Sequence, residues 1–448
     1  MRSKVTLASH LAFVALSVLA CQPASTPTPP LPAPTAIAAA ATRPLHPSPT
    51  ATALLPTTTP AVTPTPAFDP FAANLPASDF SFTIPPAIQH VTETSAVLYF
   101  AFERPTPGTV FYRSATTPIE NIAFGEDSAV HLIALPDLKP GTTYDVLVAA
   151  GSESNYGSPL FMSDVWGAQT VTTPPFASPL RFAAIGDSGF GDAATPALAA
   201  QMLARNPAFV LHLGDVVYRA GEQRNPGEAF RIKYFEQFAV LLHRVPIYPT
   251  IGNHDVEAAT LARGTPYYFT AFPPFAEPTF PAADSTPLRK WYAFSFAGVQ
   301  FLSLDSQALF GDPGRAEQEA WLEERLADSQ YVYTIPFFHV PPYSSGPHRG
   351  DGLAVRPWAD RFEAAGVPLV ISGHDHDYER LVHGPTTYII SGGGSATLYS
   401  IKAKRDESRF FASASHFTLF DVYPDRIEVR AIGADGNVID SATIATTR

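Results

Sequence analysis

The chain has 448 residues, which is enough for two or three domains with a sizeable core. Its formal net charge of -12 argues against a nucleic-acid-binding protein, because such proteins usually carry a basic patch. The same acidic balance repels polyanionic substrates at long range, so any phosphate chemistry requires local cations.

Residues 1–20 have the pattern of a secretory signal peptide. Basic residues near the start precede an apolar run that ends at Leu19 and is too short to be a comfortable membrane span. Cys21, the only cysteine of the chain, follows directly, and this pattern resembles a bacterial lipoprotein signal in which the cysteine is lipidated. We therefore expect an exported protein, lipid-anchored through Cys21 at the outer face of a bacterial membrane or cell surface. An ordinary signal with an incidental cysteine is the alternative.

Residues 21–68 are almost wholly Pro, Thr, Ala and Ser, with Arg43 as the only fixed charge. Such a segment cannot bury enough apolar surface to offset the entropy lost on ordering. We expect a disordered linker here. A glycosylated stalk is the alternative, and in both cases the segment is a spacer.

Residues 80–175 are expected to form a small β-sandwich. Short runs of β-branched and aromatic residues at 96–100, 109–112 and 144–148 are separated by clusters of proline and glycine. The stretch Leu135–Tyr144 is similar to the corner of fibronectin type III domains. We expect a packing or substrate-orienting module, with a carbohydrate- or partner-binding module as the alternative.

From residue 178 to 448, strands alternate with helices, which predicts a layered α/β (α+β) domain. In its first half, three apolar strands each end in a glycine followed by polar side chains. These strands are 181–185 before Gly186-Asp187, 210–213 before Gly214-Asp215, and 246–251 before Gly252-Asn253-His254-Asp255. Amphipathic helices are expected after the first two strands, and the second helix runs through Phe230, Tyr234 and Phe238.

The second half of this domain repeats the pattern. Strands are predicted at 292–296, 299–304, 332–338 and 367–371, with helices around 318–326 and 358–365. The last two of these strands end at His339 and at His374-Asp375-His376. Further strands with hairpin turns, such as 434–437, are expected between 388 and 444.

Five strand ends thus carry carboxylate, amide, imidazole and phenol side chains: Asp187, Asp215 with Tyr218, Asn253 with His254, His339, and His374 with His376. In open α/β sheets, the loops at the carboxyl ends of the strands bind ligands. One shared carboxylate flanked by terminal ligands suits two metal ions. Two metals can clamp the attacking and leaving oxygens of a displacement at phosphorus and lower the pKa of a bound water. The sequence therefore predicts a dinuclear metal site.

The order of these motifs is similar to that of calcineurin-like metallophosphoesterases. The common form of that family has a histidine two residues after the first aspartate, where this chain has Gly189. The stretch from Gly214 to Tyr218 instead resembles the purple acid phosphatase branch, in which a tyrosinate binds ferric iron. The segments 339–343 and 373–380 match that branch too. These enzymes often carry a fibronectin-like domain before the catalytic one, so the resemblance covers about 84–448.

The resemblance implies two metal sites that share Asp215. The implied ferric site consists of Asp187, Asp215, Tyr218 and His376. The implied site for divalent iron, zinc or manganese consists of Asp215, Asn253, His339 and His374.

The resemblance also implies roles for side chains around the metals. His254 would bind substrate and protonate the leaving alkoxide, with Asp255 orienting it. His348 stands where the family often has a second substrate-binding histidine. Arg349 is either a phosphate contact or a loop charge. Asp375 and Asp377 stand where the family more often has apolar or small residues, and they either tune the ligand histidines or point to solvent.

The sequence as a whole predicts an extracytoplasmic acid phosphatase that hydrolyses phosphate monoesters by attack of a metal-bound hydroxide. A phosphodiesterase or nucleotidase on the same metal centre is the alternative among enzymes. A non-catalytic surface protein that binds through the β-sandwich is the alternative outside them. No nucleic-acid binding is expected.

Overall fold

The described part of the chain lies within the compact unit Leu54–Arg448 of a computed structural model. It comprises residues 71, 82–89, 91, 94–125, 128–150, 160–161, 169–172, 179–218, 225–256, 267–272, 291–307 and 314–446. The predicted signal peptide, Cys21 and the linker 21–68 lie outside these residues. Within them, no helix is both long and apolar enough to cross a bilayer.

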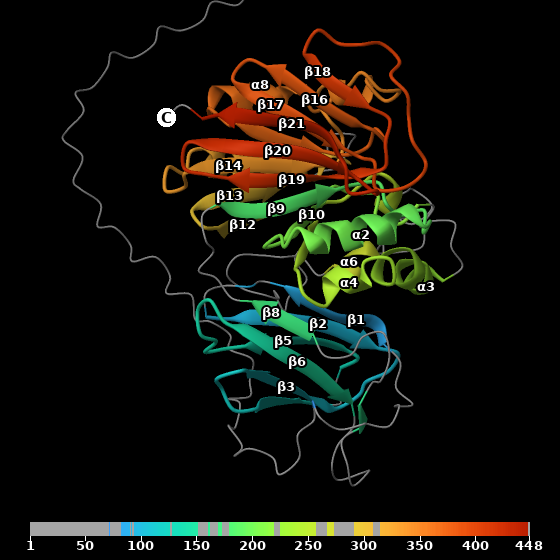
Figure 1. The fold of residues 1–448 in the computed structure, drawn as a ribbon, viewed down its shortest axis with the longest axis vertical. Helices are drawn as coiled ribbons and strands as arrows, with labels where there is room; N and C mark the ends of the chain where they lie inside the picture. The colour runs from blue at the N-terminus through green and yellow to red at the C-terminus, as the bar shows by residue number, and fades with distance from the viewer. Residues whose placement is uncertain are drawn as a thin grey trace, which may run out of the picture. The chain divides into compact units, whose positions relative to one another are not determined.

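Strands from the first part of this unit form two antiparallel sheets (Figure 1). One sheet has the order β1-β2-β5, with β1 Phe82–Gln89, β2 Ala96–Phe102 and β5 Val130–Leu135. The other contains β3 Gly108–Ser114, β4 Glu120–Phe124, β6 Thr143–Ala150, β7 Leu160–Phe161 and β8 Gln169–Thr172. The three predicted strands correspond to β2, β3 and β6. The Tyr144 hydroxyl accepts the Lys139 N–H at 2.8 Å, which closes the predicted corner locally. The fibronectin type III assignment itself remains a prediction.

Strand β2 is apolar on both faces because both faces are covered. Leu98 and Phe100 belong to the core between the two small sheets. Tyr99 and Ala101 alternate with them and belong to a second cluster together with Leu241 of the following domain. The Tyr99 hydroxyl also donates to the Thr270 carbonyl. The β domain therefore shares a buried apolar contact with the helical layer of the α/β domain.

Two mixed sheets make up the α/β domain. The first has the order β11-β10-β9-β19-β20-β21, with β9 Leu180–Ile185, β10 Val210–His212, β11 Ile247–Pro249, β19 His416–Val422, β20 Arg426–Gly433 and β21 Val438–Ala445. The second has the order β12-β13-β14-β15-β17-β16-β18, with β12 Tyr292–Phe296, β13 Val299–Ser303, β14 Tyr333–Phe338, β15 Leu369–Ser372, β16 Tyr378–His383, β17 Thr386–Ser391 and β18 Ser408–Ala412. Strands β9, β10 and β11 are parallel, as are β13, β14, β15 and β17.

The sheets pack face to face, and helices cover their outer faces (Figure 1). Phe182 and Ala184 of β9 lie between the sheets, whereas Ala183 and Ile185 face the helical layer. That layer contains α2 Ala194–Ala204, α3 Pro226–Phe230, α4 Ala239–Leu242 and α6 Tyr268–Ala271. On the second sheet lie α7 Arg315–Leu326 and α8 Arg356–Ala364, and short 3-10 turns occur at His254–Val256 and Asp351–Leu353. The predicted layered α/β fold is confirmed.

The single helix predicted through Phe230, Tyr234 and Phe238 is instead three short pieces. A π-helical turn, η2 (Arg231–Phe235), separates α3 from α4, and Glu236 N–H bonds the Arg231 carbonyl five residues back. The extra residue in this turn allows Tyr234 and Phe235 to be buried together in the same cluster. Burial of consecutive aromatic side chains has overridden the regular helical period.

The buried imidazole of His416 should make the stability of the fold depend on pH. This imidazole is fully buried, donates from Nδ1 to the Ala414 carbonyl at 2.8 Å and lies 3.1 Å from the Ser391 hydroxyl through Nε2. Burial lowers the pKa of His416 from 6.5 to about 4. The unfolded state binds this proton more readily than the folded state does. The contribution of His416 to the free energy of unfolding is therefore fully present above pH 6.5 and is lost as the pH drops towards 4.

We therefore expect His416→Asn to reduce the loss of stability between pH 7 and pH 5 by about 2 kcal/mol. Urea unfolding of the metal-free wild type and variant at both pH values measures this difference. Metal-free protein is used so that loss of bound ions in acid does not contribute. Identical pH dependence of the two proteins would contradict the assignment.

Candidate metal centre

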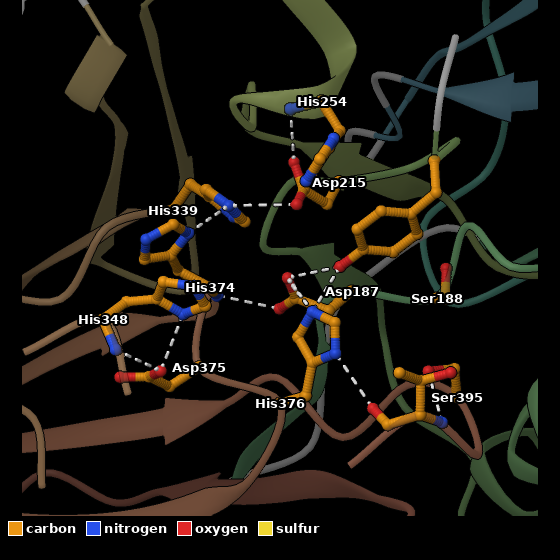
Figure 2. A network of polar contacts seen from close by, with 12 residues as sticks. Asp187, Ser188, Asp215, His254, His339, His348, His374, Asp375, His376 and Ser395 are labelled. Carbon is orange, nitrogen blue, oxygen red and sulfur yellow. Dashed lines mark hydrogen bonds and ion pairs between the residues drawn. The ribbon is translucent and has the colours of Figure 1, made fainter. Parts of the chain in front are cut away.

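The five strand ends meet at one place, and all seven predicted metal ligands lie there. Figure 2 labels Asp187, Asp215, His339, His374 and His376 among them. Asp187 follows β9, Asp215 and Tyr218 follow β10, and Asn253 follows β11. His339 follows β14, and His374 and His376 follow β15. The carboxyl ends of parallel strands lie at a common edge, and the two stacked sheets bring their edges together.

Three of these residues have left-handed backbone conformations that non-glycine residues rarely adopt. The φ angles of Asp187, Asp215 and His374 are 61°, 51° and 73°. Each of the three is two or three residues beyond its strand, where the chain turns sharply. Such conformations cost about 1–3 kcal/mol each and persist where the surrounding structure holds them. Three of the six described non-glycine residues with a positive φ are thus predicted ligands.

Two glycines allow the neighbouring strand ends to approach closely. Gly214 has a φ of 90°, and a Cβ atom there would lie 2.8 Å from Nδ1 of His339. A Cβ atom on Gly252 would lie 2.2 Å from both the backbone nitrogen and Oδ1 of Asp215. Neither position has space for a side chain, so the glycines seen in the sequence reflect contact between loops.

One half of the cluster contains Asp187, Tyr218 and His376. The Tyr218 hydroxyl lies 3.0 Å from Asp187 Oδ1 and 2.6 Å from His376 Nε2, and this nitrogen is 3.6 Å from Asp187 Oδ1. His376 Nδ1 lies 2.9 Å from the Thr397 carbonyl, which can only accept. The proton of a neutral ring is therefore on Nδ1, and the Nε2 lone pair faces the cluster.

The other half contains Asp215, Asn253, His339 and His374. His339 Nδ1 donates to the Leu213 carbonyl at 2.8 Å, and His374 Nε2 lies 2.9 Å from Asp351 Oδ2. Each ring therefore turns its other nitrogen inward. His339 Nε2 lies 3.0 Å from Asn253 Oδ1, 3.1 Å from His374 Nδ1 and 3.4 Å from Asp215 Oδ2.

Charge within the cluster is unbalanced without a cation. Burial lowers the pKa of His339, but the charges of Asp215 and Asp187 outweigh it and raise that pKa to about 10. Burial, followed by the charge of Asp187, raises the pKa of the Tyr218 phenol well above its usual value. The carboxylates thus attract positive charge to His339 Nε2 and keep the phenol protonated.

A metal ion fits this donor set better than a proton does. A proton on His339 Nε2 can bond only one of the three acceptors around it, whereas a cation accepts lone pairs from all of them. Asp187, Asp215 and His339 are buried, and one ligand atom from each lies within 4.8 Å of the others. The outward nitrogens of all three histidines bond acceptors, which is the usual arrangement of metal-bound imidazoles.

His254 and Asp255 lie beside Asp215. The backbone N–H of His254 donates to Asp215 Oδ1 at 2.9 Å, and its ring centre is 4.8 Å from that of Tyr218. The Asp255 carboxylate accepts the Gly252 and Val216 N–H groups at 2.8 and 3.0 Å. Asp255 therefore ties the loop after β11 to the loop after β10, and burial raises its pKa to about 7. A bond that orients His254 stays a prediction.

His348 lies over the cluster, with its ring centre 4.6 Å from that of His374. Arg349 is exposed, and its contact with phosphate stays a prediction. The expectation that Asp375 points to solvent is wrong, whereas tuning of the ligand histidines by Asp375 stays a prediction. This carboxylate is fully buried and lies 3.0 Å from Nδ1 of His348 (Figure 2).

Asp377 is also fully buried, so the solvent alternative fails for it as well. Neither of its carboxylate oxygens has a hydrogen-bond partner among the described residues. Burial, with the charges of Asp375 and Glu379, raises the pKa of Asp377 well above its usual value. The structure thus favours the protonated form of this side chain.

Sequence reasoning missed three residues at the site. Asp351 bonds His374, Phe190 stacks on Tyr218 at 3.9 Å between ring centres, and Tyr399 stacks on His376 at 4.1 Å. Asp351 and Phe190 lie in loops of the predicted motifs, but no spacing rule relates them to the side chains they touch. Tyr399 follows the ligand motif by more than twenty residues and is placed by the loop after β17.

Comparison with known proteins shows which family this site resembles. Residues 180–378 match the calcineurin-like phosphoesterase family. An uncharacterized protein of Mycobacterium tuberculosis is 28% identical over 253 residues, covering 47% of this chain but only 44% of that protein. Tartrate-resistant acid phosphatase type 5 of Oryctolagus cuniculus is 25% identical over 294 residues, covering 57% of this chain and 88% of that protein.

Among solved structures, a purple acid phosphatase from yellow lupin (Lupinus luteus) seeds has a similar fold. Its TM-score is 0.64 at 17% identity, covering 80% of this chain and 74% of that chain. The family match spans β9 to the first residue of β16 and includes every predicted metal ligand. The chain therefore contains a calcineurin-like metallophosphoesterase domain, with purple acid phosphatases among its homologues.

Proposed function

We propose that this protein is an extracytoplasmic acid phosphatase that hydrolyses phosphate monoesters with two metal ions. The main observation behind the proposal is that His339, His374 and His376 each turn a ring nitrogen inward, towards buried carboxylates. The likeness to acid phosphatases of rabbit and lupin supports the monoester reaction. The signal-like residues 1–20 support export, and Cys21 is the proposed lipid anchor.

The two halves of the cluster match the two proposed metal sites. Asp187, Tyr218 and His376 would hold a ferric ion, for which phenolate and carboxylate are hard ligands. Asn253, His339 and His374 would hold a divalent iron, zinc or manganese ion. Asp215 has a ligand atom within 4.8 Å of ligand atoms of both Asp187 and His339, so it would serve both sites.

The bound ions would supply Lewis acidity for activating water and neutralising phosphoryl charge. The chain's own side chains would bind and orient the ester. His254 and His348 lie on the half-buried rim of the cluster, so their rings can reach a phosphate group from two loops. His254 would donate a proton to the leaving oxygen, since it is held beside Asp215 by its own backbone.

A comparison of ester classes tests the proposed reaction. We expect the metal-loaded protein to hydrolyse p-nitrophenyl phosphate faster than bis(p-nitrophenyl) phosphate, measured by release of p-nitrophenol at several pH values. A strong preference for the bis ester would favour the phosphodiesterase alternative. An inert protein that retains no metal after expression with iron and zinc would favour the non-catalytic binding protein.

Tyr218 tests the proposed ferric site. Wild-type protein loaded with iron should show a visible absorption band from charge transfer between tyrosinate and ferric iron. Tyr218→Phe removes the phenolate oxygen, so the band should disappear. Elemental analysis of the same samples provides the control for metal content. A colourless, fully active enzyme that contains only zinc or manganese would rule out the ferric assignment.

Asp351 tests the second metal site. Its carboxylate bonds His374 Nε2, and its negative charge raises the basicity of the inward ring nitrogen. Asp351→Asn keeps an acceptor but removes that charge, so it should weaken binding of the divalent ion about tenfold. Competition with a chelator measures this affinity. Glu324→Gln is a matched control, because it removes one carboxylate whose side chain is 73% exposed on α7. Equal affinities in the two variants would show that Asp351 does not support the site.

A further inference from the structure

Asp375 stands between two predicted metal ligands, yet its carboxylate bonds a different histidine. Oδ1 accepts the backbone N–H of His348 at 3.1 Å and lies 3.0 Å from its ring nitrogen Nδ1. Oδ2 accepts the hydroxyl of Ser344. The carboxylate is fully buried, so these bonds replace the hydration that it loses on folding.

The loop after β14 is shaped around this carboxylate. A Cβ atom on Gly346 would lie 2.6 Å from Cγ of Asp375, so the backbone of the loop runs directly over it. The Ser344 hydroxyl also accepts the Gly346 N–H at 2.9 Å, which links the two contacts. Asp375 therefore holds both the backbone and the ring of His348.

The bond to Asp375 determines which nitrogen of His348 is available. The carboxylate accepts the proton on Nδ1, so Nε2 is the nitrogen left for another group. The ring contacts those of His374 and Tyr399, with ring centres 4.6 and 5.3 Å away. About a third of the His348 side chain (37%) is exposed, so a ligand at the cluster can reach it.

We propose that Asp375 is a positioning residue that orients His348 towards the phosphate group of the substrate. This inference rests on the proposed function of the site. Asp375 touches neither substrate nor metal in this scheme, and it acts only through the ring and backbone of His348.

A second carboxylate–imidazole hydrogen bond joins the same loop to the end of β15, but here the loop supplies the carboxylate. Asp351, from the loop, bonds His374 at the end of β15. Asp375, after β15, bonds His348 in the loop (Figure 2). The two bonds serve different groups, a proposed metal ligand and a proposed substrate contact. Variants of the two aspartates should therefore have separate effects.

The experiment measures binding of inorganic phosphate to the metal-loaded protein by titration calorimetry, together with kcat and KM for p-nitrophenyl phosphate. The variants are Asp375→Ala, His348→Ala and the double variant, with Asp351→Asn for comparison. We expect Asp375→Ala to weaken phosphate binding and raise KM about tenfold. Metal content, measured by elemental analysis, should match that of the wild type, unlike that of Asp351→Asn.

The double variant distinguishes positioning from general support of the fold. If Asp375 acts through His348, removing Asp375 should not weaken phosphate binding further once the His348 ring is absent. A double variant that binds phosphate about tenfold more weakly than His348→Ala would overturn the inference. So would wild-type phosphate binding by Asp375→Ala.

Asp375→Asn covers the case in which the alanine variant does not fold. Its amide oxygen can still accept the Nδ1 proton of His348, so phosphate binding should stay within about threefold of the wild type. A loss as large as that of His348→Ala would contradict orientation by this hydrogen bond. A wild-type protein that neither binds phosphate nor hydrolyses esters would overturn the proposed function, and this inference with it.

Discussion

Buried acceptor atoms that face one another are the constraint on which the rest of the site depends. The inward nitrogens of three histidines lie among the oxygen atoms of Asp187, Asp215 and Asn253. Of these residues, all but Asn253 are buried. Burying unpaired acceptors is costly, so cations bound among them would stabilise the arrangement. The formal net charge of -12 makes such local positive charge necessary for binding a phosphate ester as well.

The scaffold holds this arrangement through rigid strands and short, strained turns. Asp187, Asp215 and His374 keep left-handed backbones because the apolar layer between the two sheets fixes the strands that precede them. The Asp255 carboxylate also accepts backbone N–H groups from the loops after β10 and β11, which fixes the two loops to each other. Strain at the ligands is thus balanced by packing away from them.

The loop after β14 connects the candidate metal centre with His348, one of the side chains proposed to bind substrate. Two hydrogen bonds join this loop to the end of β15. One pairs Asp375 with His348, and the other pairs Asp351 with His374. The Asp351 bond would support a proposed metal ligand, and the Asp375 bond would orient a proposed substrate contact. The position of His348 therefore depends on the same edge of the second sheet that carries the proposed divalent site.

The sequence by itself determined the layered α/β class, most strand positions and the polar residues at the strand ends, because apolar runs ending in glycine are local signals. It did not determine the broken helix around η2, where burial of adjacent aromatic rings outweighed the helical period. Nor did it determine the roles of Asp375 and Asp351. Their partners lie 27 and 23 residues away along the chain, and only the stacking of strand ends brings a carboxylate and an imidazole into contact. Tertiary structure decided those pairs because hydrogen bonding depends on distance and direction in space.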